Sequence, residues 1–144
     1  MAAGLAEPMT DAAKPPYSHT FRIYWEDTDA GGVVFFVNYL KIFERARTEW
    51  LRSFGYGQER IRTELNALFV VTETHMKYLL PARLDDELRI TVQIQHVGAA
   101  SMKIAQEAWR GDERLAEGSI RIGCVDAGTF RPCRIPTELI QGIA

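Results

Sequence analysis

Two aspartates, two glycines and an unbroken apolar run lie next to one another near the start of the chain. The segment EDTDAGGVVFFVNYL, residues 26–40, holds Asp27 and Asp29, and the apolar run 33–37 follows the glycines. A helical pattern begins after that run, and the first turn of a helix leaves N–H groups unpaired at the positive end of its dipole. Such groups can polarise a carbonyl oxygen, while a nearby carboxylate can activate water or attack the carbonyl carbon. These residue types at this spacing therefore favour hydrolysis of an activated acyl group in an apolar pocket.

Three other interpretations of the two aspartates compete with this chemistry. In a calcium loop counted from Asp27, Gly31 and Asn38 would fill the fifth and twelfth positions, so the bidentate glutamate is missing and this interpretation fails. A phosphatase of the haloacid dehalogenase kind needs a parallel sheet with alternating helices, whereas this chain has a single long helical pattern. A plain turn, in which Asp and Thr side chains satisfy backbone donors, stays open, although the apolar run must still form or line a pocket.

Hydrophobic spacing predicts the elements that would position this segment. Alternation indicates a half-buried strand over residues 19–25, before the loop. After the loop, apolar residues recur at helical spacing over roughly four turns, Asn38 is a candidate N-cap, and two glycines end the helix. A short helix or turn is predicted over residues 57–66, a short helix after Pro136, and four further strands at 69–79, 87–97, 101–110 and 114–125. One long apolar helix with a run of antiparallel strands is typical of a two-layer α+β domain.

Length, composition and charge narrow the class of protein. The chain has 144 residues, which fits one domain, and the stretch 1–16 is rich in Ala and Pro, so we expect a disordered arm there. A net charge of −2 provides no field for nucleic acid, and no stretch is long and apolar enough to span a membrane. Cys124 and Cys133 lack the spacing of a metal site, so we expect no metal. The start of the chain does not read as a signal peptide, which favours a cytoplasmic protein.

Four segments together resemble a known family of enzymes. They are residues 24–34 (YWEDTDAGGVV), 38–41 (NYLK), 43–49 (FERARTE) and 81–88 (PARLDDEL). This pattern closely resembles the hotdog-fold acyl-CoA thioesterases, within them the 4-hydroxybenzoyl-CoA thioesterase family, and specifically the YbgC-type branch associated with the Tol–Pal system. The likeness covers residues 19–137.

The resemblance implies a fold, an activity and a set of site residues. It implies an α+β hotdog fold, in which a five-stranded antiparallel sheet wraps around one long central helix, as a single domain over residues 17–144. It implies hydrolysis of acyl-CoA, without a cofactor or metal, by a homodimer or homotetramer whose active sites lie between subunits; an acyl carrier protein is a second candidate partner. The catalytic aspartate falls on Asp29, and the backbone N–H that polarises the carbonyl falls on Phe36. The expected substrate-binding residues are Gly32, Val33, Val34, Phe35, Asn38, Val71 and Thr72.

One residue departs from the family pattern. YbgC-type enzymes usually read Val-Val-Tyr-His-Ala-Asn, whereas this chain has Val-Val-Phe-Phe-Val-Asn, so Phe36 replaces the histidine. A backbone donor survives this change, but proton transfer by imidazole does not, and an aromatic residue here is closer to the hydroxybenzoyl-type branch. The acyl group is therefore expected to be short-chain aliphatic or aromatic. A binding module for acyl-CoA or an acyl carrier that has lost activity is the alternative, and a hydroxyacyl dehydratase would need a histidine in the pocket.

Overall fold

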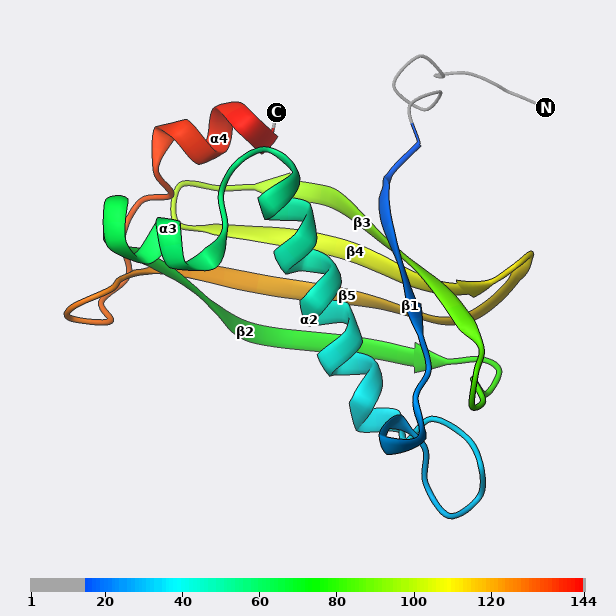
Figure 1. Cartoon of the computed structure of the whole chain (residues 1–144). Helices are drawn as coiled ribbons and strands as arrows, with labels where there is room; N and C mark the ends of the chain where they lie inside the picture. Colours follow the sequence, from blue (N-terminus) through cyan, green and yellow to red (C-terminus); the bar gives the residue numbers. More distant parts are fainter. Residues whose placement is uncertain (1–14, 144) are drawn as a thin grey trace.

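Five antiparallel strands form one sheet, and a long helix crosses one face of it (Figure 1). The computed structural model describes residues 15–143, so nearly all of the predicted arm 1–16 lies outside the described residues. The elements in chain order are β1 (Tyr17–Arg22), the 3-10 helix η1 (Trp25–Asp27), α2 (Phe36–Ser53), α3 (Gln58–Glu64), β2 (Ala67–Tyr78), β3 (Glu87–Val97), β4 (Ser101–Arg110), β5 (Glu113–Asp126) and α4 (Thr137–Ile143). The strand order β1-β3-β4-β5-β2 leaves β1 and β2 at the edges. The predicted α+β hotdog architecture is thus confirmed.

The first strand lies earlier in the chain than its prediction. Strand β1 pairs with β3 from Tyr17↔Val92 to Arg22↔Glu87, whereas the sequence pattern indicated residues 19–25. The alternation continues as far as Ile23, which is buried, but Trp25 is 79% exposed in η1. The prediction was wrong there because alternation alone cannot tell the last residue of a strand from an exposed aromatic residue in the following turn.

Helix α2 buries one face against the sheet because its apolar residues recur every three or four positions. The buried residues of this helix are Tyr39, Ile42, Phe43, Ala46, Arg47, Trp50 and Leu51. All of them except Arg47 belong to the same hydrophobic core cluster as Leu88 of β3, Ile104 of β4 and Ile120 of β5. The helix ends at the C-cap Phe54, and Gly55 follows with φ of +96°, a conformation that glycine adopts without strain. A buried face of this length fixes the axis of α2 and therefore the place of its first turn.

The start of α2 differs from its prediction. The N-cap is Phe35, with no capping side chain, and Asn38 is the third residue of the helix. The side chain of Asn38 instead donates from Nδ2 to the carbonyl oxygen of Asp27 at 2.9 Å, which ties the preceding loop to the helix. Asn38 is therefore not the cap, but it still fixes the geometry of the helix start.

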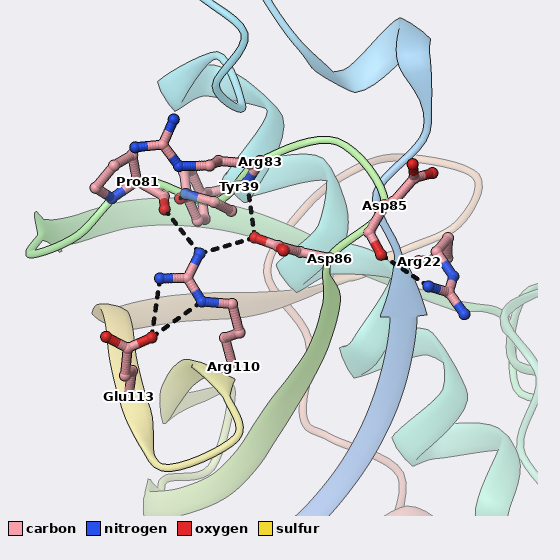
Figure 2. A network of polar contacts seen from close by, with 9 residues as sticks. Arg22, Tyr39, Pro81, Arg83, Asp85, Asp86, Arg110 and Glu113 are labelled. Atoms are coloured by element: carbon pink, nitrogen blue, oxygen red, sulfur yellow. Dashed lines mark hydrogen bonds and ion pairs between the residues drawn. The ribbon is translucent and has the colours of Figure 1, made fainter.

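A polar network holds the loop of residues 79–86 beside Tyr39 of α2, whose hydroxyl accepts the N–H of Ala82 at 3.1 Å (Figure 2). Arg110, at the end of β4, donates from Nη1 to Oδ2 of Asp86 at 2.8 Å and to the carbonyl oxygen of Pro81 at 3.2 Å, and also pairs with Glu113. The same Asp86 oxygen accepts the N–H of Arg83 at 2.8 Å. The loop in turn receives the chain before α2, because the N–H of Val34 donates to the carbonyl oxygen of Ala82 at 2.8 Å. One guanidinium thus organises the loop on which the helix start rests.

We expect Arg110→Met to weaken this support. Its guanidinium and the Asp86 carboxylate are only 29% and 21% exposed, so the pair is partly shielded from water. Loss of these bonds should lower the free energy of unfolding by about 1–2 kcal/mol in chemical denaturation. Amide exchange at Val34 should also become faster, because its acceptor is held by the network.

The matched control is Arg62→Met, which removes an exposed ion pair with Glu59 on α3. Its stability should match that of the wild type, because exposed pairs contribute little. Equal effects of the two substitutions would show that the Arg110 network does not support the loop.

Candidate active site

The loop between η1 and α2 is a tight hairpin. Thr28 and Val34 form an antiparallel bridge, and the N–H of Asp29 donates to the carbonyl oxygen of Val33 at 2.9 Å. The turn is closed by the N–H of Gly32, which donates to the carbonyl oxygen of Asp29 at 3.0 Å. Gly32 has φ of +80°, which a residue with a side chain rarely adopts. Gly32 therefore shapes the turn, and its backbone lies exposed beside Asp29.

The two aspartates of this hairpin make different bonds. Asp27 caps η1, because its Oδ2 accepts the N–H of Tyr24 at 2.9 Å. Asp29 lies exposed, and its Oδ1 accepts the N–H of Gly31 at 2.8 Å. The Oδ2 atom of Asp29 makes no hydrogen bond within residues 15–143. Asp27 is thus committed to the backbone, while Asp29 keeps one carboxylate oxygen for another molecule.

The backbone at the start of α2 leaves a donor unpaired. The N–H of Phe35 donates to the carbonyl oxygen of Asp27 at 3.2 Å, and the N–H of Asn38 donates to the carbonyl oxygen of Phe35 at 2.8 Å. The N–H of Phe36 has no acceptor in the part of the chain that the structure describes. It lies at the positive end of an 18-residue helix, where a negative charge is stabilised.

Aromatic side chains form a cleft of about 270 Å³ beside this donor, lined by Val34, Phe36, Tyr39, Tyr78 and residues 79–81. The Phe36 ring is 56% exposed and lies 6.0 Å from the Tyr78 ring between centroids. The hydroxyl of Tyr78 donates to the carbonyl oxygen of Phe36 at 3.2 Å, which links the end of β2 to the first residue of α2. Burial raises the pKa of Tyr78, so this hydroxyl stays protonated at neutral pH.

A second cleft, of about 470 Å³, lies between α2 and β2 and contains Val71. Thr72 is not among the residues that line it; this residue falls at the irregularity of β2, and its hydroxyl donates to the carbonyl oxygen of Arg121 at 3.3 Å. The structure therefore places Asp29, Gly32, Val33, Val34, Phe35, Phe36 and Asn38 along one loop and helix start. It places Val71 on β2, at the second cleft, and the hydroxyl of Thr72 bonds to the backbone of the neighbouring strand β5.

Sequence reasoning missed two contributors to this region. Tyr78 and residues 79–81 wall the first cleft, but they come from the far end of β2, more than forty positions after the loop. Arg47 lines the second cleft, although its place in the helical pattern marks it only as a charged residue near the core face. The sequence signal for the first of these was the apolar pair Leu79 and Leu80 directly before Pro81.

No group of three or more His, Cys, Asp or Glu side chains in residues 15–143 could hold a metal ion. None of the helices in this part of the chain is long and apolar enough to cross a membrane.

Known proteins share this architecture and sequence. The family model of the thioesterase-like superfamily matches residues 23–143. The acyl-CoA thioesterase YbgC of Haemophilus influenzae is 37% identical over 85% of this chain and 90% of that protein. The 1,4-dihydroxy-2-naphthoyl-CoA hydrolase of Nostoc punctiforme is 29% identical over 87% of this chain and 83% of that protein. Among solved structures, a probable thioesterase from Bartonella henselae has a TM-score of 0.81 and 28% identity, over 84% of this chain and 99% of that chain.

The match to the family model spans the hairpin of Asp29, the whole of α2 and four strands of the sheet, β2 to β5. This chain belongs to the thioesterase-like superfamily and, within it, groups with the YbgC acyl-CoA thioesterases.

Proposed function

We propose that this protein is an acyl-CoA thioesterase that releases a free acid and CoA, with Asp29 and the N–H of Phe36 as its catalytic groups. One observation carries the proposal. A carboxylate with a free oxygen and an unpaired N–H at a helix start lie at the two ends of one short, hydrogen-bonded loop. The named activities of the YbgC and naphthoyl-CoA relatives support the same reaction class.

The thioester carbonyl oxygen accepts the N–H of Phe36, and the helix dipole stabilises the negative charge that develops on that oxygen. Asp29 then acts in one of two ways. As a general base it takes a proton from water, whose oxygen attacks the carbonyl carbon. As a nucleophile its carboxylate oxygen attacks the carbon, and water later hydrolyses the resulting anhydride. In both cases the C–S bond breaks and CoA leaves as a thiolate that takes up a proton.

The absence of a histidine at position 36 reduces the number of reaction classes that the site supports. The three histidines lie on separate strands, His19 on β1, His75 on β2 and His96 on β3, and none of them lines either cleft described above. A dehydratase that needs an imidazole in the pocket is therefore disfavoured. The aromatic wall of Phe36 and Tyr78 supports acyl groups that are aromatic or short-chain aliphatic, since rings pack favourably against rings.

The unpaired edge of β2 supports a homodimer or a dimer of dimers. This strand is twelve residues long, lies at one end of the sheet and exposes Val71 and Tyr78. An exposed edge that is long and partly apolar invites pairing with a second copy. We propose that a second copy of the chain closes the cleft between α2 and β2. The acyl group is delivered by acyl-CoA or by an acyl carrier protein, and the proposed compartment is the cytoplasm.

Asp29→Asn should keep the fold and lower kcat by about 10²–10⁴-fold, because the amide can neither take a proton nor attack the carbonyl. Release of CoA thiol from several acyl-CoAs measures this. Asp27→Asn is the matched control: its amide oxygen can still cap η1, so its turnover should stay far closer to that of the wild type. Equal losses at both positions would show that the roles are wrongly assigned. Binding without any thiol release by the wild type would favour the binding module instead.

Light scattering at micromolar concentration should give twice or four times the 16.3 kDa mass of the chain. The physical reason is the apolar edge of β2, which stays in water in a single copy. A fully active species with the mass of one chain would refute the proposed assembly while leaving the role of Asp29 intact.

A further inference from the structure

A buried cation of α2, Arg47, has no ion-pair partner within residues 15–143, and the charge of Glu44, one turn earlier on the helix, acts on it only from beyond ion-pair distance. Arg47 is only 7% exposed, and its Nη1 donates to Oε1 of Gln106 at 2.9 Å. Gln106 is fully buried and is fixed by its own bond from Nε2 to the carbonyl oxygen of Phe43 at 3.0 Å. Within residues 15–143, the other donors of this guanidinium make no hydrogen bond and no carboxylate pairs with it. A guanidinium has five N–H donors, and an unpaired buried charge is costly, so this position is suited to an anionic partner.

The cleft of about 470 Å³ between α2 and β2 gives such a partner access to Arg47. Its apolar wall comes from Leu40 of α2, Val71 of β2 and Ile120 of β5. The methylene groups of a ligand can pack on these side chains, and the buried Arg47 lines the same cleft. The cleft therefore fits a molecule with an apolar stem and an anionic end.

The charges around this cleft are mainly positive. Lys41 and Arg45 line it together with Arg47, and Glu44 is its single carboxylate. Glu44 is engaged with its own helix, because its Oε2 accepts the hydroxyl of Thr48 at 2.8 Å. A protein whose net charge is −2 thus gathers three cations at one apolar cleft, which favours an acidic ligand there.

The cleft lies along the flank of α2 that starts at the proposed oxyanion donor. Phe36, Leu40, Glu44 and Arg47 recur every three or four residues, so they share one flank of the helix. Strand β2 follows this flank, since Tyr78 bonds to Phe36 at one end and Val71 lines the cleft with Arg47 further along. The helix rises roughly 16 Å over the eleven residues from Phe36 to Arg47. Because helical side chains lean toward the N-terminus, the guanidinium of Arg47 lies roughly 12 Å from the N–H of Phe36.

We propose that Arg47 is a specificity residue that binds the terminal carboxylate of a dicarboxylic acyl-CoA. The thioester carbonyl lies at the N–H of Phe36, and the methylene chain lies between Leu40 and Val71. An extended chain advances roughly 1.2 Å per bond, so an acyl group of about six to eight carbons spans the distance. This inference rests on the proposed thioesterase function and adds, through the second cleft, an acyl class to the aromatic and short-chain groups that the first cleft supports.

A carboxylate fits the position better than the phosphates of CoA do. The planar fork of a guanidinium pairs with a carboxylate through two parallel hydrogen bonds, and Gln106 fixes the orientation of that fork. The phosphates are bulky and belong to the leaving group, on the other side of the thioester carbonyl from the acyl chain.

The experiment compares suberoyl-CoA with octanoyl-CoA, which have eight carbons each and differ only in the terminal carboxylate. The kcat/KM for thiol release should be higher for suberoyl-CoA in the wild type. Arg47→Met should lower that value for suberoyl-CoA by about 10- to 100-fold, because a charge-assisted pair is lost, and should leave octanoyl-CoA unchanged or improved. Arg52→Met is the matched control on the same helix; it removes an exposed pair with Glu49 and should leave the substrate ratio unchanged.

Arg47→Lys tests the same point in a variant that keeps the charge, and it decides the outcome if Arg47→Met does not fold. It should lose activity selectively on suberoyl-CoA because an ammonium lacks the fork. An unchanged substrate ratio in the Arg47 variants overturns the inference. Equal losses on both substrates would point to the CoA phosphates, and a shift to the monomer would point to a partner's carboxylate. If other acyl-CoAs are hydrolysed in a reaction that needs Asp29, but suberoyl-CoA is not preferred, this inference alone is refuted. If no acyl-CoA is hydrolysed, the proposed function is refuted as well.

Discussion

The position of the free N–H of Phe36, at the start of α2, depends on the burial of one face of that helix in the core. Its aromatic and aliphatic face, from Tyr39 to Leu51, is packed into the core, so the helix axis cannot turn without exposing that face. The first turn therefore stays at the end of β2, where Tyr78 and the bond between Val34 and Ala82 hold it. A donor that is fixed before a ligand binds needs no reorganisation during the reaction, which is the physical basis of oxyanion stabilisation.

The hairpin before α2 separates two chemically identical side chains by geometry. Asp27 and Asp29 are two residues apart, but the turn of η1 directs the first toward the N–H of Tyr24. The second follows the hairpin and keeps one oxygen free. Because Asn38 ties the carbonyl oxygen of Asp27 to the helix, the distance between the carboxylate of Asp29 and the donor at Phe36 is set by a short, closed path of bonds. Positioning of this kind can supply a large part of a rate enhancement.

Local patterns predicted the parts of the fold that have a strong period. The helix and the strand over residues 87–97 follow from apolar spacing, and the resemblance in residues 24–34 identified the loop. The predicted end of β1 was wrong, because Trp25 is hydrophobic like a strand residue but lies in η1. The predicted capping role of Asn38 was wrong as well, because asparagine often caps helices but the N-cap here is Phe35. The contacts of Arg110 and Arg47 could not be predicted from the sequence, because each joins residues that lie twenty to sixty positions apart. Periodicity contains no information about such contacts.

We propose that the start of α2 polarises the thioester carbonyl. Infrared difference spectroscopy measures this directly, with ¹³C-carbonyl benzoyl-CoA bound to the Asp29→Asn variant so that the substrate is not consumed. A hydrogen bond from the N–H of Phe36 and the field of the α2 dipole weaken the C=O bond, so we expect a carbonyl stretch at lower frequency than in the free substrate in water. A bound substrate whose carbonyl frequency equals that in water would show that the start of α2 does not polarise the carbonyl.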